Sequence, residues 1–145
     1  MTRFDLSTVE FFRYDSLVTN HEMQLYSILT ENLNKYYPNQ YIICPKVRIG
    51  DIIRMTNRTF DKLIRRRYQS RHFDFVICSK DTLKPILAIE LQDNSHKNKY
   101  WRYVDALKRE LCTNAGLLLL QLWTTNALDI KKLLYHWLKN KEIAI

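Results

Sequence analysis

The chain has 145 residues, which is enough for one domain with a substantial core and too few for two. Its 46% hydrophobic and 26% charged residues are typical of a globular protein, and a net charge of +8 favours a polyanionic partner. Because it has no apolar run of membrane-spanning length and no apolar centre of a signal peptide near the N-terminus, we expect no membrane partner.

The three cysteines, Cys44, Cys78 and Cys112, are far apart in the sequence and lie in apolar segments. We expect free, buried thiols rather than a zinc site, because no paired Cys/His spacing accompanies them. Free thiols favour a reducing compartment, so we expect a cytoplasmic location.

The first part of the chain predicts an arm, a helix and a strand. Residues 1–18 contain apolar residues without a clean period, and we expect an arm or short helix that packs onto the domain. Thr19 and Asn20 can cap a helix over residues 22–36, whose apolar residues recur at helical spacing. Residues 41–49 predict a strand, and Pro45 within it indicates an edge position or a bulge.

The remaining elements alternate between helices and short apolar strands. Residues 51–68 are expected to be helical in part, residues 72–78 and 85–92 to form an antiparallel hairpin, and residues 97–114 to form a helix that stops at Gly116. Residues 117–123 predict a strand buried on both faces, in the middle or the parallel part of a sheet, and residues 127–141 a last helix. The order α-β-(α)-β-β-α-β-α predicts an α/β fold, with a central mixed four-stranded sheet flanked by helices.

Acidic residues stand where the two hairpin strands should be apolar. Asp74 lies between Phe73 and Phe75, and Glu90 interrupts a similar apolar run. A buried carboxylate costs several kcal/mol unless it is compensated, and a divalent cation shared by both would compensate them. Gln92 projects to the same side of its strand as Glu90 because strand side chains alternate. Asp74 can lie beside Glu90 if the hairpin register allows it, giving an oxygen site suited to Mg²⁺ or Mn²⁺.

Most of the net charge lies just before the Asp74 strand. Between residues 54 and 72 there are seven Arg or Lys residues and one Asp, including Arg65, Arg66, Arg67 and Arg71. Two interpretations fit this run: a solvated helix face, or a surface that binds the phosphates of a nucleic acid.

The α-β-β-β-α-β order, with an acid on the second strand and Glu-x-Gln ending the third, resembles the restriction-endonuclease-like PD-(D/E)XK superfamily. The sequences FDFV at residues 73–76, IELQDNSH at residues 89–96 and AGLLLL at residues 115–120 resemble, more narrowly, a bacterial domain-of-unknown-function family within it. In that family the domain often stands alone or is fused to zinc-ribbon or helicase parts. The match covers residues 22–123.

The resemblance implies roles for particular residues. Asp74 and Glu90 would be the metal ligands for Mg²⁺ or Mn²⁺, and Glu22 would add a ligand directly or through water. Gln92 stands where the family pattern has a catalytic lysine, and Lys108 on the following helix, which shares a face with Asp105, could supply the missing charge. His96 could act as a base or bind phosphate. We expect Arg65, Arg66, Arg67, Arg71 and Arg102 to contact a nucleic acid.

Structural roles remain open for several of these residues. Asp74 could pair with Arg71 or Arg67, and Glu22 could be a helix N-terminal residue favoured by the dipole. Asp105 and Lys108 could form a helix-surface pair, and His96 could have no role.

Taken together, the residues predict one nuclease-like domain over residues 1–145, with an arm at 1–18, a core at 19–123 and a C-terminal helix at 124–145. The expected function is metal-dependent hydrolysis of phosphodiester bonds, in DNA in preference to RNA. The alternatives are a catalytically inactive module that binds nucleic acid or docks a protein, and a subunit that acts as a homodimer or within a larger assembly.

Overall fold

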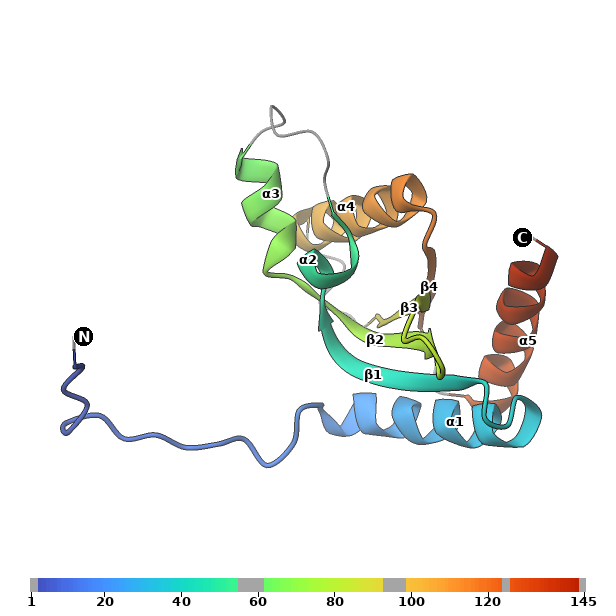
Figure 1. The fold of residues 1–145 in the computed structure, drawn as a ribbon, viewed down its shortest axis with the longest axis horizontal. Coiled ribbons are helices and arrows are strands. Elements are labelled where there is room, and N and C mark those ends of the chain that lie inside the picture. The colour runs from blue at the N-terminus through green and yellow to red at the C-terminus, as the bar shows by residue number, and fades with distance from the viewer. Residues whose placement is uncertain (1–2, 55–61, 93–98, 124–125, 144–145) are drawn as a thin grey trace.

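A computed structural model describes residues 3–54, 62–92, 99–123 and 126–143. Within these ranges the chain forms five helices and four strands (Figure 1). In chain order they are α1 (Asn20–Tyr36), β1 (Tyr41–Arg48), α2 (Ile49–Ile52), α3 (Lys62–Gln69), β2 (His72–Ser79), β3 (Pro85–Leu91), α4 (Lys99–Ala115), β4 (Leu118–Leu122) and α5 (Ala127–Ile143). The predicted order of elements is confirmed.

The four strands form one mixed sheet in the order β1-β2-β3-β4. β1 and β2 are antiparallel, as are β2 and β3, whereas β4 runs parallel to β3. The edge position that Pro45 indicated for β1 is confirmed. β4 is parallel as expected and lies at the other edge of the sheet; Leu120 and Leu122 are buried, whereas Leu119 on the opposite face is only partly buried, so the expected burial on both faces is confirmed in part.

Helices cover both faces of the sheet (Figure 1). On one face α1 and α5 pack against Phe75, Ile77 and Ile89 through residues that include Leu29 and Ile130. On the other face lies a second cluster, formed by Ile49, Ile53, Tyr68, Phe73, Val76, Cys78, Ala88 and Cys112. These two apolar layers fix the sheet between the helices, and they leave the C-terminal end of β3 and the start of β2 beside α4.

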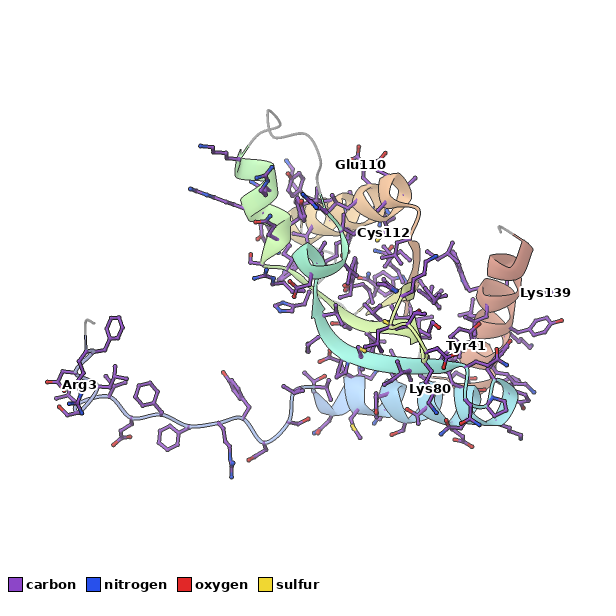
Figure 2. The ribbon with its side chains drawn as sticks, in the orientation of Figure 1. Arg3, Tyr41, Lys80, Glu110, Cys112 and Lys139 are labelled. Carbon is purple, nitrogen blue, oxygen red and sulfur yellow. The ribbon has the colours of Figure 1, made fainter. Side chains whose placement is uncertain are left out.

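Residues 3–18 do not pack onto the domain. They form no helix and extend away from α1, with side chains such as Phe12 and Tyr14 at 86% and 95% exposure (Figure 2). Val18, where the segment meets α1, is the exception and packs against the core. The prediction of an arm is confirmed, whereas the prediction that this arm packs onto the domain is wrong. Without a regular period the apolar side chains present no single face to the domain.

The three cysteines are free and Cys78 and Cys112 are buried, as expected, whereas Cys44 is only partly buried. None of the described helices is both long enough and apolar enough to span a membrane.

Candidate functional site

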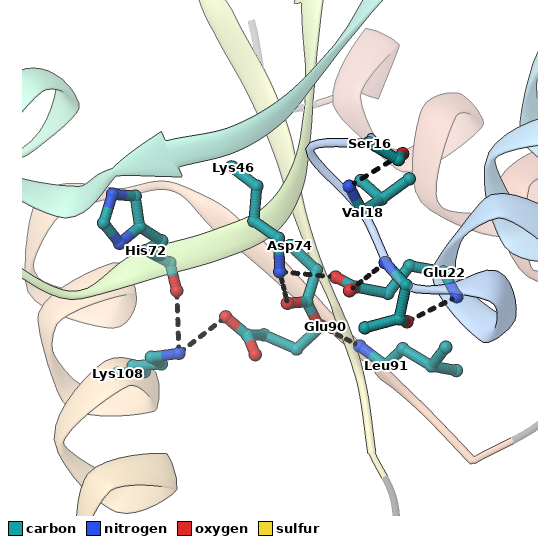
Figure 3. Close-up of polar contacts among 10 residues, drawn as sticks. Ser16, Val18, Glu22, Lys46, His72, Asp74, Glu90, Leu91 and Lys108 are labelled. Carbon is teal, nitrogen blue, oxygen red and sulfur yellow. Dashed lines mark hydrogen bonds and ion pairs between the residues drawn. The ribbon is translucent and has the colours of Figure 1, made fainter. Parts of the chain in front are cut away.

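The β2–β3 hairpin brings Asp74 and Glu90 to neighbouring positions. Phe75 of β2 pairs with Ile89 of the antiparallel β3. Asp74 precedes Phe75 and Glu90 follows Ile89, so the same register places Asp74 opposite Glu90. Oδ2 of Asp74 accepts a hydrogen bond of 2.8 Å from the backbone N–H of Leu91 (Figure 3). Glu90 is 3% exposed. The two acids that the sequence singled out therefore share one site.

Lys108 reaches this pair from α4. Its Nζ donates to Oε1 of Glu90 at 2.7 Å and to the backbone oxygen of His72 at 2.9 Å (Figure 3). Lys108 and Asp105 are both buried, at 8% and 7% exposure, so the interpretation as a helix-surface pair is wrong. The ammonium group of Lys108 therefore lies between Glu90 and the first residue of β2.

Glu22 comes from the first turn of α1, where it completes a capping box with Thr19. The backbone N–H of Thr19 donates to Oε1 of Glu22 at 3.0 Å, and the Glu22 N–H donates to Oγ1 of Thr19 at 3.2 Å. These bonds both begin the helix and fix the direction of the carboxylate. Oε2 of Glu22 therefore remains for a partner outside the helix.

That partner is Lys46 of β1. Its Nζ lies 2.8 Å from Oε2 of Glu22 and 3.8 Å from Oδ1 of Asp74 (Figure 3). Lys46 has a φ of 51°, and the pairing of β1 with β2 skips it between Pro45 and Val47. This left-handed residue in an edge strand aims the lysine at both acids, and Asp74 therefore pairs with Lys46 rather than with Arg67 or Arg71.

Burial and charge shift the pKa values of the three carboxylates in different directions. Desolvation raises the pKa of Glu90 to about 7, with Asp74 adding to the shift and Lys108 opposing it. Desolvation also raises the pKa of Asp74, against the hydrogen bond from Leu91. For Glu22 burial acts in the same upward direction, but the bonds from Lys46 and Thr19 outweigh it and lower the pKa.

Two adjoining hollows meet at these residues. The first, here called the carboxylate cavity, has a volume of about 320 Å³ and is lined by Thr19, His21, Glu22, Lys46, Asp74, Glu90, Leu91, Trp101, Val104, Asp105 and Lys108. The second, here called the basic cleft, has a volume of about 550 Å³ and is lined by Lys46, Arg66, Arg67, Ser70, Arg71, His72, Asp74, Trp101 and Lys108. They share Lys46, Asp74, Trp101 and Lys108, so the acidic floor opens directly onto a basic surface.

The donor set of the carboxylate cavity fits a hard divalent cation held by few protein ligands. Among the described residues, no three His, Cys, Asp or Glu side chains are grouped closely enough to hold a metal ion by themselves. Mg²⁺ is usually held by one or two carboxylates, with waters and substrate phosphates completing its shell. Asp74 and Glu90 supply two carboxylates, and each uses only one oxygen in the hydrogen bonds given above. Glu22 is already bound to Lys46.

The other predicted site residues are divided by the structure. Arg66, Arg67 and Arg71 line the basic cleft, while Arg65 and Arg102 are not among its lining residues. Gln92 is 4% exposed and does not line the carboxylate cavity; its Oε1 is buried, with no hydrogen-bond partner in the described part of the chain. His96 lies outside the described residues.

Lys46 is the residue of the site that sequence reasoning missed. It stands between Pro45 and Val47, in a strand that is otherwise mostly apolar. A single lysine in an edge strand is usually interpreted as a residue that keeps the sheet from pairing with another chain. Its link to Glu22 spans 24 residues of sequence and has no local pattern.

Comparison with known proteins places the chain in a family. The model of a protein family of unknown function, DUF2726, matches residues 14–136, and the chain belongs to this family. An uncharacterized protein of Haemophilus influenzae is 26% identical over 117 residues, which are 81% of this chain and 58% of that protein. The chain thus spans little more than half the length of this relative. No solved structure matches this chain.

Proposed function

We propose that this chain is a metal-dependent nuclease that hydrolyses phosphodiester bonds in DNA. The observation that carries the proposal is the junction of the carboxylate cavity with the basic cleft at Lys46, Asp74 and Lys108. A phosphodiester whose neighbouring phosphates are held by arginines in the cleft would reach the carboxylates at its inner end.

The strand order gives further support. Asp74 lies on β2 and Glu90 on the antiparallel β3, and β4 runs parallel to β3 after the helix α4. This is the arrangement that membership of the PD-(D/E)XK superfamily implies, and we propose that membership here.

The chain's own residues divide the chemistry among them. Asp74 and Glu90 would hold Mg²⁺ or Mn²⁺, which when bound supplies Lewis-acid stabilisation of phosphoryl charge and an activated water. Lys108, fixed between Glu90 and the His72 carbonyl, stabilises negative charge on the reacting phosphate. It takes the charge role that the neutral Gln92 lacks. Arg66, Arg67 and Arg71 hold the flanking phosphates.

Lys46 acts as a positioning residue. Its ammonium group lies between Glu22 and Asp74, where it compensates both carboxylates in the metal-free protein. The contact of Lys46 with Glu22, at 2.8 Å, is shorter than its contact with Asp74, at 3.8 Å, so Lys46 can remain on Glu22 while Asp74 turns to another cation. Glu22 then orients Lys46 rather than binding the metal directly.

A second candidate function is a nucleic-acid-binding module without turnover. Two observations favour it. Lys46 already compensates Asp74 and Lys108 already compensates Glu90, and Gln92 stands in the position of the catalytic lysine. Such a module would use the same basic cleft, and the two functions differ in whether a strand is cut.

We further propose that the protein acts in the cytoplasm, because its thiols are free, and as a homodimer or within a larger assembly.

The test is a cleavage assay with linear duplex and single-stranded DNA in the presence of Mn²⁺ or Mg²⁺. We expect the wild-type protein to cut, and Asp74→Asn and Glu90→Gln to lose at least about a hundredfold in rate, since each removes a charged ligand. Asp81→Asn is the matched control, because Asp81 is an exposed carboxylate in the turn at the far end of the hairpin.

Binding without cleavage, unchanged in Asp74→Asn and Glu90→Gln with either metal, would replace the nuclease by the binding module. Cleavage that persists in both variants would show that another site, or a contaminant, carries the activity.

A further inference from the structure

Three large aromatic side chains stand exposed at the start of α4. Tyr100, Trp101 and Tyr103 are 54%, 37% and 49% exposed. Trp101 lines both the carboxylate cavity and the basic cleft. The rest of this helix buries its apolar side, through Val104 and Cys112, in the usual way. A cluster of exposed aromatic rings beside a charged cleft indicates a surface for a flat ligand.

Arginines of the basic cleft hold the two tyrosines. Nη2 of Arg71 donates to the Tyr100 hydroxyl at 2.5 Å, with the guanidinium carbon 5.5 Å from the ring centre. Nη1 of Arg67 donates to the Tyr103 hydroxyl at 3.1 Å, with the guanidinium carbon 5.9 Å from that ring. Both tyrosine rings therefore lie against arginines that line the basic cleft, next to Trp101, which lines it as well.

The depth of the carboxylates limits what can reach them. Glu90 is 3% exposed and lines the carboxylate cavity. A phosphate that approaches Glu90 must therefore enter this cavity, which Trp101 also lines. In a duplex each phosphate is carried on a stiff and wide double helix, which hinders this entry, whereas a flexible unpaired strand can enter and turn its bases outward. Unpaired bases stack on aromatic side chains while a basic groove follows the backbone.

From these observations we propose that the ligand of the site is unpaired nucleic acid, with bases stacked on Tyr100, Trp101 and Tyr103 and phosphates on the arginines of the basic cleft. The inference rests on the proposed function for the meaning of the carboxylates, and it adds the substrate class: a single-stranded end, flap or loop rather than the interior of a duplex.

The test is a binding measurement in EDTA, so that no strand is cut. Fluorescence anisotropy of a labelled single-stranded DNA 20-mer is compared with that of the blunt duplex of the same sequence. We expect at least about tenfold tighter binding of the single strand, and a loss of about tenfold in Trp101→Ala, the size of one stacked base. Trp101→Phe keeps a ring and should retain most of the affinity.

Two controls separate stacking from folding and from general charge. Tyr135→Leu removes an exposed tyrosine of α5, which is 58% exposed and outside the cleft, and should bind as the wild type does. Tyr103→Leu should weaken binding of the single strand, and it tests the proposal even if Trp101→Ala fails to fold. Equal or tighter binding of the duplex, or unchanged binding by Trp101→Ala and Tyr103→Leu when both are folded, would overturn the proposal.

The outcome is distinguishable from failure of the nuclease. If the protein cuts nothing with Mn²⁺ but binds the single strand through Trp101, the proposed nuclease activity is wrong and the proposed ligand class stands. Cleavage of duplex interior and single strand at equal rates would keep the enzyme and remove the ligand class.

Discussion

Glu90 places an acid with a raised pKa at the floor of the cavity. Its pKa of about 7 exceeds the ordinary value of 4.5, so between these pH values the folded protein binds more protons than the unfolded chain. Stability therefore falls as pH rises from about 4.5 to about 7, by about 3 kcal/mol if Glu90 acts alone. Urea unfolding of the metal-free protein at several pH values measures this slope.

Glu90→Gln should flatten that pH dependence, because the amide does not titrate. A divalent cation should stabilise the ionised form, so Mn²⁺ should raise the melting temperature more at pH 8 than at pH 5. A stability that rises between pH 5 and pH 7 in EDTA, equally in wild type and Glu90→Gln, would contradict the assignment of this shift to Glu90.

Lys46 combines a contact with a strained backbone. Both Lys46→Ala and Lys46→Gly remove the ion pair with Glu22, but only glycine adopts a φ of 51° without cost. We therefore expect Lys46→Gly to be more stable than Lys46→Ala by about 1 kcal/mol, the reverse of the usual order within a strand. Denaturant unfolding of the two variants decides this, and an alanine variant of equal or greater stability would refute it.

At the scale of single residues, the sequence identified Asp74 and Glu90 because each interrupts an apolar run. Lys108 was named because the resemblance lacks its lysine at Gln92, and the spacing of its helix placed it on one face with Asp105. Lys46 was not, because its role depends on a left-handed backbone and on an acid 24 residues away. Gln92 was predicted to project to the same side as Glu90, but it lies beyond the end of β3 at Leu91 and does not line the carboxylate cavity.

The first turn of α1 serves both the helix and the site. Thr19→Ala removes the bond to the Glu22 N–H and should cost about 1 kcal/mol of stability, whereas Thr19→Ser keeps the hydroxyl and most of that stability. Thermal unfolding of the three proteins measures the difference. Equal losses in the serine and alanine variants would show that the methyl group of Thr19, and not its hydroxyl, matters.

At the scale of elements, the helices and strands could be predicted closely because their periodicities and stop signals are local. Gly116, at φ 67°, ends α4 as its type suggested. The edge position of β4 could not be predicted from its apolar run. A half-buried edge strand under helices and a central strand have the same composition. The exposure of residues 3–18 escaped prediction because apolar content alone does not specify a docking face.

For the whole molecule, the order of elements was sufficient to predict a mixed four-stranded sheet between helices. The site needed more, since it joins α1, β1, the β2–β3 hairpin and α4, elements spread over most of the chain. Which face each helix covers decides whether Lys108 meets Glu90, and tertiary packing decides that face. The basic run before β2 likewise lines the basic cleft only because α3 ends beside the site.

The most direct single measurement is the rate at which a labelled DNA strand is cut with Mn²⁺ at pH 8 by wild type, Lys108→Met and Lys84→Met. Lys84 is an exposed lysine in the β2–β3 turn, at the end of the hairpin away from the site. We expect the wild type and Lys84→Met to cut at similar rates and Lys108→Met to be slower by at least about a hundredfold. No cutting by the wild type, or equal cutting by Lys108→Met, would contradict a nuclease in which Lys108 stabilises the reacting phosphate.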